Sequence, residues 1–172
     1  MKVLLISPHA DDAEIGMGGT ILSLVENGAE VKLLTAIIPC EYLDGKSSSS
    51  FKKKRINEQK KAAELLGVDL QVLDLNPYEL RFDREHIKLF DEIIRQYSPN
   101  AIYSCFRHDT HQDHITISKI IEVAARKNTS SFYMYENMIP GGITLQPFNP
   151  QYFVNISDYN LRKIEILNIF IF

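Results

Sequence analysis

Buried-strand patterns and helical patterns alternate along the whole chain, and this alternation limits the fold more than any other feature. Short continuous apolar runs suit buried strands, whereas longer segments repeat their apolar residues at helical spacing. The predicted strands are residues 3–7, 31–38, 68–75, 101–105 and 131–136, and the predicted helices are residues 13–27, 52–66, 83–97 and 115–126. Strands that alternate with helices build a mainly parallel sheet with helices on both faces. We therefore expect an α/β fold of the Rossmann-like, doubly wound type.

Length and composition are those of one globular domain. The 172 residues are enough for a single core, and no linker or repeat divides them, so we expect one domain over 1–172. The net charge of −3 offers no basic surface for nucleic acid, and no apolar run reaches the ~20 residues that span a bilayer. The two cysteines, Cys40 and Cys105, suit a reducing compartment, so we expect free thiols and a cytoplasmic protein.

Histidines and aspartates concentrate in two loops that follow predicted strands. Residues 8–14 read PHADDAE directly after the first strand, and residues 106–114 read FRHDTHQDH directly after the fourth. In the commonest doubly wound sheet these two strands are neighbours, and ligands bind beyond their carboxyl ends, where the winding reverses. Four of the five histidines are therefore expected to meet at one point, and only His86 lies elsewhere.

The residue types in these loops predict a metal site. Adjacent aspartates repel each other, and a buried charge must be paired or bound to a metal. A catalytic zinc takes three nitrogen or oxygen ligands plus water, which one histidine from each loop and one aspartate would supply. The other member of the Asp11–Asp12 pair would then face the water as a general base. His111, held by Asp113, is a candidate to stabilise an oxyanion.

Several motifs carry a resemblance to a known family. PHADDAEIGMGGT and HQDH resemble the two signatures of the LmbE-like, or PIG-L, family of zinc-dependent N-deacetylases. RINEQKKAAELLGV (55–68) resembles the family's second helix, and FYMYENM resembles the segment after its fourth helix. The resemblance extends roughly over residues 2–165.

The resemblance implies a metal centre and a reaction. By position in the motifs, His9, Asp12 and His114 would bind zinc, and Asp11 would be the base that activates water and later protonates the leaving amine. The family acts mostly on N-acetylglucosamine-type amides and releases acetate and a free amine. A small N-acetylated sugar or sugar conjugate is thus the expected partner, and a homo-oligomer is possible.

Further roles follow from the same resemblance, together with two departures from it. His111 would stabilise the tetrahedral intermediate, Asp113 would orient His111, and Arg55 would contact the substrate or the acidic cluster. Gln112 stands where the family commonly has proline, which should affect only loop rigidity. Family members usually continue beyond the helix that begins near Asp158, so we expect this domain to be shortened at its C-terminus, where a pocket wall would follow.

Two other functions are open at this point. One is a metal-binding but inactive homologue, or a sugar-binding subunit, that lacks the C-terminal pocket wall. The other, less favoured, is a metal-free nucleotide-binding Rossmann protein, suggested by the glycines in 16–19. A dinucleotide motif needs its glycines in the turn after the strand, so we interpret these helical glycines as packing residues. The polar loop 39–50 leaves the same sheet edge, and we expect it to close over substrate.

Overall fold

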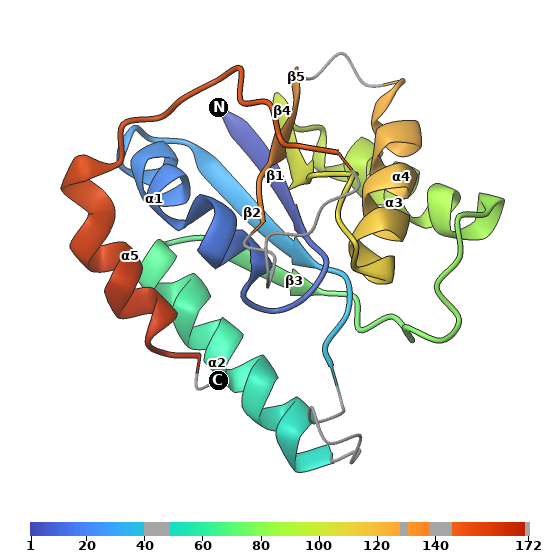
Figure 1. Ribbon diagram of the computed structural model, residues 1–172, viewed down its shortest axis with the longest axis horizontal. Coiled ribbons are helices and arrows are strands. Elements are labelled where there is room, and N and C mark those ends of the chain that lie inside the picture. Colours follow the sequence, from blue (N-terminus) through green and yellow to red (C-terminus); the bar gives the residue numbers. More distant parts are fainter. Residues whose placement is uncertain (40–48, 128–130, 138–145, 171–172) are drawn as a thin grey trace.

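Five parallel strands form one sheet in the order β3-β2-β1-β4-β5 (Figure 1). The computed structural model describes residues 1–39, 49–127, 131–137 and 146–170. The strands are β1 (Lys2–Ser7), β2 (Glu30–Thr35), β3 (Asp69–Val72), β4 (Ala101–Cys105) and β5 (Ser131–Tyr135). Because β1 pairs with β2 on one side and with β4 on the other, the winding reverses between β1 and β4. The predicted doubly wound α/β fold is confirmed, and so is the predicted pairing of the first and fourth strands.

Helices cover both faces of the sheet (Figure 1). They are α1 (Asp12–Glu26), α2 (Ser49–Leu66), α3 (Arg84–Tyr97), α4 (Gln112–Ala125) and α5 (Asn160–Leu167), which a 3-10 helix, η2 (Ser157–Tyr159), precedes. Leu5 of β1 packs in the core beneath α1, α2 and α5. Its neighbours Leu4 and Ile6 pack in the core beneath α3 and α4. Both faces of β1 are therefore buried, which explains its continuous apolar sequence.

The starts of two helices show what capping signals can reveal. The predicted cap of the third helix is confirmed, because the Asp83 carboxylate accepts the backbone N–H of His86 at 3.0 Å. The predicted start of the fourth helix at Ile115 is wrong by three residues, since α4 begins at Gln112. His111 caps it, with Nδ1 accepting the backbone N–H of Asp113 at 3.2 Å. Apolar residues at helical spacing begin only at Ile115. The first turn of α4 is polar, so this spacing does not predict it.

The first helix buries only part of the apolar stripe that its spacing suggests. Of Ile15, Gly19, Leu22 and Val25, which repeat at helical spacing, Gly19 and Leu22 are buried and the other two are only partly buried. Met17 and Ile21 are also in the core, and Glu14 is fully buried. The helical glycines pack closely, as interpreted from the sequence. Gly16 lies against the end of β5, but Gly18 and Gly19 contact the segment around α5 rather than the sheet.

Some expectations lie outside the described residues. The predicted lid falls mostly on residues 40–48, which include Cys40, and neither is described. Cys105 is a free, buried thiol, as expected. Among the helices that the structure describes, none is both long enough and apolar enough to cross a bilayer.

Candidate metal centre

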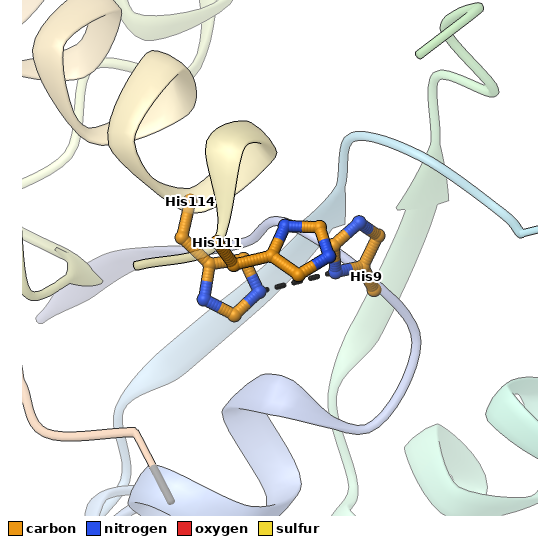
Figure 2. A group of neighbouring side chains, drawn as sticks. All are labelled: His9, His111 and His114. Atoms are coloured by element: carbon orange, nitrogen blue, oxygen red, sulfur yellow. Dashed lines mark hydrogen bonds between the residues drawn. The ribbon is translucent and has the colours of Figure 1, made fainter. Parts of the chain in front are cut away.

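The two polar loops meet at the carboxyl edge of the sheet, as their positions in the sequence predict. His9 follows β1, while His111 and His114 lie at the start of α4, which follows β4. Figure 2 shows the three imidazole rings converging from these two segments. Their ligand atoms all lie within 4.8 Å of one another, so the cluster can hold a metal ion.

Three donor atoms face a common point within this cluster. Nδ1 of His9 lies 3.1 Å from Nε2 of His114. Oδ2 of Asp12 lies 3.3 Å from the first of these nitrogens and 3.1 Å from the second. The Asp12 carboxylate is itself held by the backbone N–H of His9, at 2.9 Å. This is the set of three residues that the sequence predicts as ligands.

The donor set and its spacing suit zinc. Around a zinc ion with ligand distances of about 2.0–2.1 Å, tetrahedral geometry separates two ligands by about 3.3–3.4 Å. The three observed separations, 3.1–3.3 Å, are close to this value. The ligand atoms of His9, His111 and His114 lie within the wider limit of 4.8 Å of one another, whereas the set with Asp12 in place of His111 has separations of 3.1–3.3 Å. Cys105, the one cysteine in the described part of the chain, is buried and hydrogen-bonded to the backbone carbonyl of His114, which leaves no thiolate in this set.

The protonation of the cluster reflects its mutual contacts. Burial alone lowers the pKa of His9, but hydrogen bonds to Asp113 and Asp12 outweigh it and raise the pKa to about 9. Burial also opposes ionisation of Asp12, yet hydrogen bonds from His114 and His9 hold its pKa well below the usual range. These contacts favour a positive charge beside the Asp12 carboxylate, and a metal ion bound there would have to displace the proton of His9.

Asp11 occupies a different environment from Asp12. Burial and repulsion from Asp12 raise the pKa of Asp11 to about 7, although the positive charge of Arg55 opposes the rise. Nη1 of Arg55 is held by Glu58 Oε2 at 3.1 Å. Arg55 is therefore close enough to influence the charge of Asp11, and its contact with a substrate stays a prediction.

His111 lies against the other two rings but is exposed to solvent. Its ring centroid is 4.8 Å from that of His9 and 4.7 Å from that of His114. Because Nδ1 accepts a backbone N–H, a neutral ring carries its proton on Nε2. The packed rings remove part of the water around the exposed His111 ring, and this loss of solvation together with the charges of His9 and His114 lowers its pKa, which favours the neutral form.

The carboxylate of Asp113 does not contact His111, contrary to the predicted pairing. Oδ2 of Asp113 lies 3.0 Å from Nε2 of His9. Only the backbone N–H of Asp113 reaches His111. At the start of α4, side chains two residues apart point in different directions, so the carboxylate turns toward the loop after β1.

Three further buried residues lie at the site, and the sequence assigned none of them a role there. Asp109 and Asn137 both contact Nδ1 of His114, at 2.6 and 3.0 Å. Glu14 is fully buried, no side chain in the described residues bonds its carboxylate, and burial raises its pKa to about 8. Asp109 lies in the histidine-rich loop, and Asn137 follows the fifth strand, so the sequence placed both near the site. It did not identify His114 as their common partner.

A doubly wound sheet with histidines and carboxylates gathered at its switch point defines a candidate metalloenzyme. Residues 4–125 match the model of the family described as PIG-L: GlcNAc-PI de-N-acetylase. The chain belongs to the PIG-L family, a family of hydrolytic deacetylases, and the predicted resemblance is confirmed.

Individual relatives agree with this assignment. The chain is 32% identical over 178 aligned residues to diacetylchitobiose deacetylase of Thermococcus kodakarensis, covering 95% of this chain and 67% of that protein. It is 27% identical, with a TM-score of 0.80, to the structure of N,N'-diacetylchitobiose deacetylase from Pyrococcus horikoshii with an inhibitor, covering 98% of this chain and 68% of that one. A 4-carboxy-2-hydroxymuconate hydratase from Pseudomonas putida also has a TM-score of 0.80, at 19% identity and with 98% and 78% coverage. That last likeness concerns the fold alone.

Proposed function

We propose that this protein is a zinc-dependent N-deacetylase that hydrolyses the N-acetyl amide of an N-acetylglucosamine-type sugar or sugar conjugate. The products are acetate and a free amine. The observation that carries the proposal is the convergence of His9 Nδ1, Asp12 Oδ2 and His114 Nε2 beside a second carboxylate, that of Asp11. The two relatives named as diacetylchitobiose deacetylases support the choice of substrate class.

The proposed reaction divides the work of the two aspartates. His9, Asp12 and His114 would hold the zinc ion, which would act as a Lewis acid toward the amide carbonyl and would lower the pKa of water. Asp11 accepts a proton from the attacking water as the new C–O bond forms. It then passes that proton to the amide nitrogen as the C–N bond breaks, so that the amine leaves neutral. In the metal-free protein, burial and Asp12 raise the pKa of Asp11 to about 7, which makes this carboxylate a better proton acceptor than an ordinary aspartate.

Four further side chains complete the proposed site. His111, with its proton on Nε2, donates a hydrogen bond to the oxyanion of the tetrahedral intermediate. The backbone N–H of Asp113 fixes the orientation of the His111 ring, and the carboxylate of Asp113 fixes the orientation of His9. Arg55 contacts the substrate, and Glu58 holds its guanidinium in place.

Acetate release tests the proposal directly. Purified protein would be treated with chelator, reloaded with zinc, and assayed for acetate from N-acetylglucosamine, diacetylchitobiose and N-acetylglucosamine conjugates. We expect release only after zinc is restored, and at least ~10²-fold slower release from Asp11→Asn. Stoichiometric zinc without release from any of these compounds would instead support the inactive, sugar-binding homologue.

A further inference from the structure

His114 is a buried ring whose two nitrogens meet different partners. Nε2 faces the Asp12 carboxylate at 3.1 Å, on the side of the converging donors. Nδ1 faces away from them, toward Oδ2 of Asp109 at 2.6 Å and the side-chain amide of Asn137 at 3.0 Å. These three neighbours come from different segments, namely the start of α1, the loop after β4 and the segment that follows β5.

The Asp109 contact selects one tautomer of His114. A neutral imidazole carries one proton, and a ring that binds a metal through Nε2 must carry that proton on Nδ1. An ionised carboxylate only accepts hydrogen bonds, so Asp109 requires a proton on Nδ1. The contact is short, as charge-assisted hydrogen bonds are, and Asp109 is only 3% exposed.

The buried Asp109 carboxylate has a hydrogen-bond partner on each oxygen. Its Oδ2 lies against Nδ1 of His114, and its Oδ1 accepts the backbone N–H of His111. The His111 bond, to Oδ1 at 2.8 Å, also ties the same carboxylate to the capping residue of α4. One side chain thus fixes both the ring of His114 and the backbone of His111.

Asn137 completes the contacts of Nδ1 once its amide is oriented correctly. A nitrogen that carries a proton cannot accept another N–H, so an amide nitrogen 3.0 Å from Nδ1 opposes the tautomer that Asp109 selects. Oδ1 of Asn137 is buried and has no partner among the described residues. Rotating the terminal amide by 180° brings Oδ1 to Nδ1, where it becomes a second acceptor, and the side chain keeps its shape.

We propose that Asp109 is the positioning residue that holds His114 in its metal-binding tautomer, with Asn137 as the second acceptor for the same proton. This inference rests on the proposed function, because it needs a metal on Nε2 of His114. Neither residue touches substrate. Partners of this kind behind a ligand histidine typically change metal affinity by about 10- to 100-fold.

Zinc affinity in competition with a chelator tests the inference without reference to activity. We expect Asp109→Asn to bind zinc about 10- to 100-fold more weakly than the wild type and to change the visible spectrum of the cobalt-loaded protein. Asp83→Asn is the matched control, since Asp83 likewise accepts a backbone N–H of His86 and lies 2.9 Å from its Nδ1, at the start of α3. The control should bind zinc as the wild type does.

A second pair of variants keeps the test decisive if Asp109→Asn does not fold. Asn137→Asp retains an acceptor and should bind zinc within a few-fold of the wild type, whereas Asn137→Leu should bind more weakly. Nitrogen-15 shifts of the metal-free protein at alkaline pH should report a proton on Nδ1 of His114. A wild type that binds no zinc would overturn the proposed function and this inference together. A wild type that binds zinc, with equal affinity in Asp109→Asn and Asn137→Leu, would overturn this inference alone.

Discussion

Replacing Gly16 by alanine should lower the stability of the protein through steric overlap, although alanine favours a helix more than glycine does. The same replacement should also disturb the metal centre. Gly16 lies on α1, one turn beyond Asp12. A Cβ there would lie 2.6 Å from Cδ2 of Tyr135 and 2.7 Å from the backbone oxygen of Glu136. Carbon atoms normally pack about 3.5–4.0 Å apart, so the contact with Tyr135 is about 1 Å too short, and the contact with the Glu136 oxygen is also shorter than real Cβ contacts. The Tyr135 hydroxyl donates to the carbonyl of Ile6 at 2.9 Å, which keeps its ring from swinging away.

The size of the effect follows from two opposing contributions. Alanine gains about 1 kcal/mol of helix propensity over glycine, while overpacking costs about 1–3 kcal/mol. Gly18→Ala is the matched control, since it has the same propensity gain, and its Cβ would meet only the flexible side chain of Lys163, at 3.1 Å. We expect Gly16→Ala to be about 1–3 kcal/mol less stable than Gly18→Ala. For a chain of this size, that lowers Tm by about 2–12 °C.

Thermal and denaturant unfolding of the two variants measure this difference, and zinc affinity measures its consequence. Glu136 precedes Asn137, whose amide lies 3.0 Å from Nδ1 of His114. Displacing the end of β5 should therefore weaken zinc binding in Gly16→Ala but not in Gly18→Ala. Equal stability of the two variants, or a more stable Gly16→Ala, would refute the packing argument.

The remaining predictions concern the metal and its protons. His114→Ala should lose most of its zinc by elemental analysis, whereas His86→Ala, outside the cluster, should keep it; full occupancy in the first variant would contradict the ligand assignment. Asp11→Asn should keep zinc and lose at least ~10²-fold in rate, while Asp12→Asn should lose zinc, and the reverse pattern would exchange their roles. Because the pKa of His9 is raised to about 9 without metal, zinc must displace a proton at neutral pH. As the pH falls from 8 to 6, the dissociation constant of zinc should then rise at least about tenfold for each pH unit. A dissociation constant that does not change with pH would show that no proton is released.

The elements that the sequence predicted best are those whose signal is local. Strand β4 was predicted over its full length, and α3 within one residue, because a buried apolar run and a capping aspartate mark them. The predicted start of α4 was wrong because the first turn of this helix is polar. It failed also at Glu14, a charged residue that apolar spacing would never place in the core.

At the site, the sequence located the loops but not every contact between them. His9 and the HQDH histidines could be brought together because strand order determines which loops are neighbours. The partner of the Asp113 carboxylate depends instead on side-chain direction over one turn of helix, which spacing does not determine. Asn137 reaches His114 only through the register of β5 on β4. Such contacts are properties of the assembled sheet rather than of any one segment.

The adjacent carboxylates of the first loop differ because the backbone turns sharply between them. Asp11 has φ 99° and ψ −30°, a positive φ that side-chain-bearing residues rarely adopt and that commonly marks functional sites. The turn leaves Asp12 as the first residue of α1, with its carboxylate between two imidazoles. Burial opposes ionisation of both carboxylates, but only Asp12 has hydrogen bonds from His114 and His9 that overcome it and lower its pKa. Burial and the charge of Asp12 raise the pKa of Asp11 to about 7. A sharp backbone turn can thus prepare one carboxylate to hold a cation and its neighbour to accept a proton.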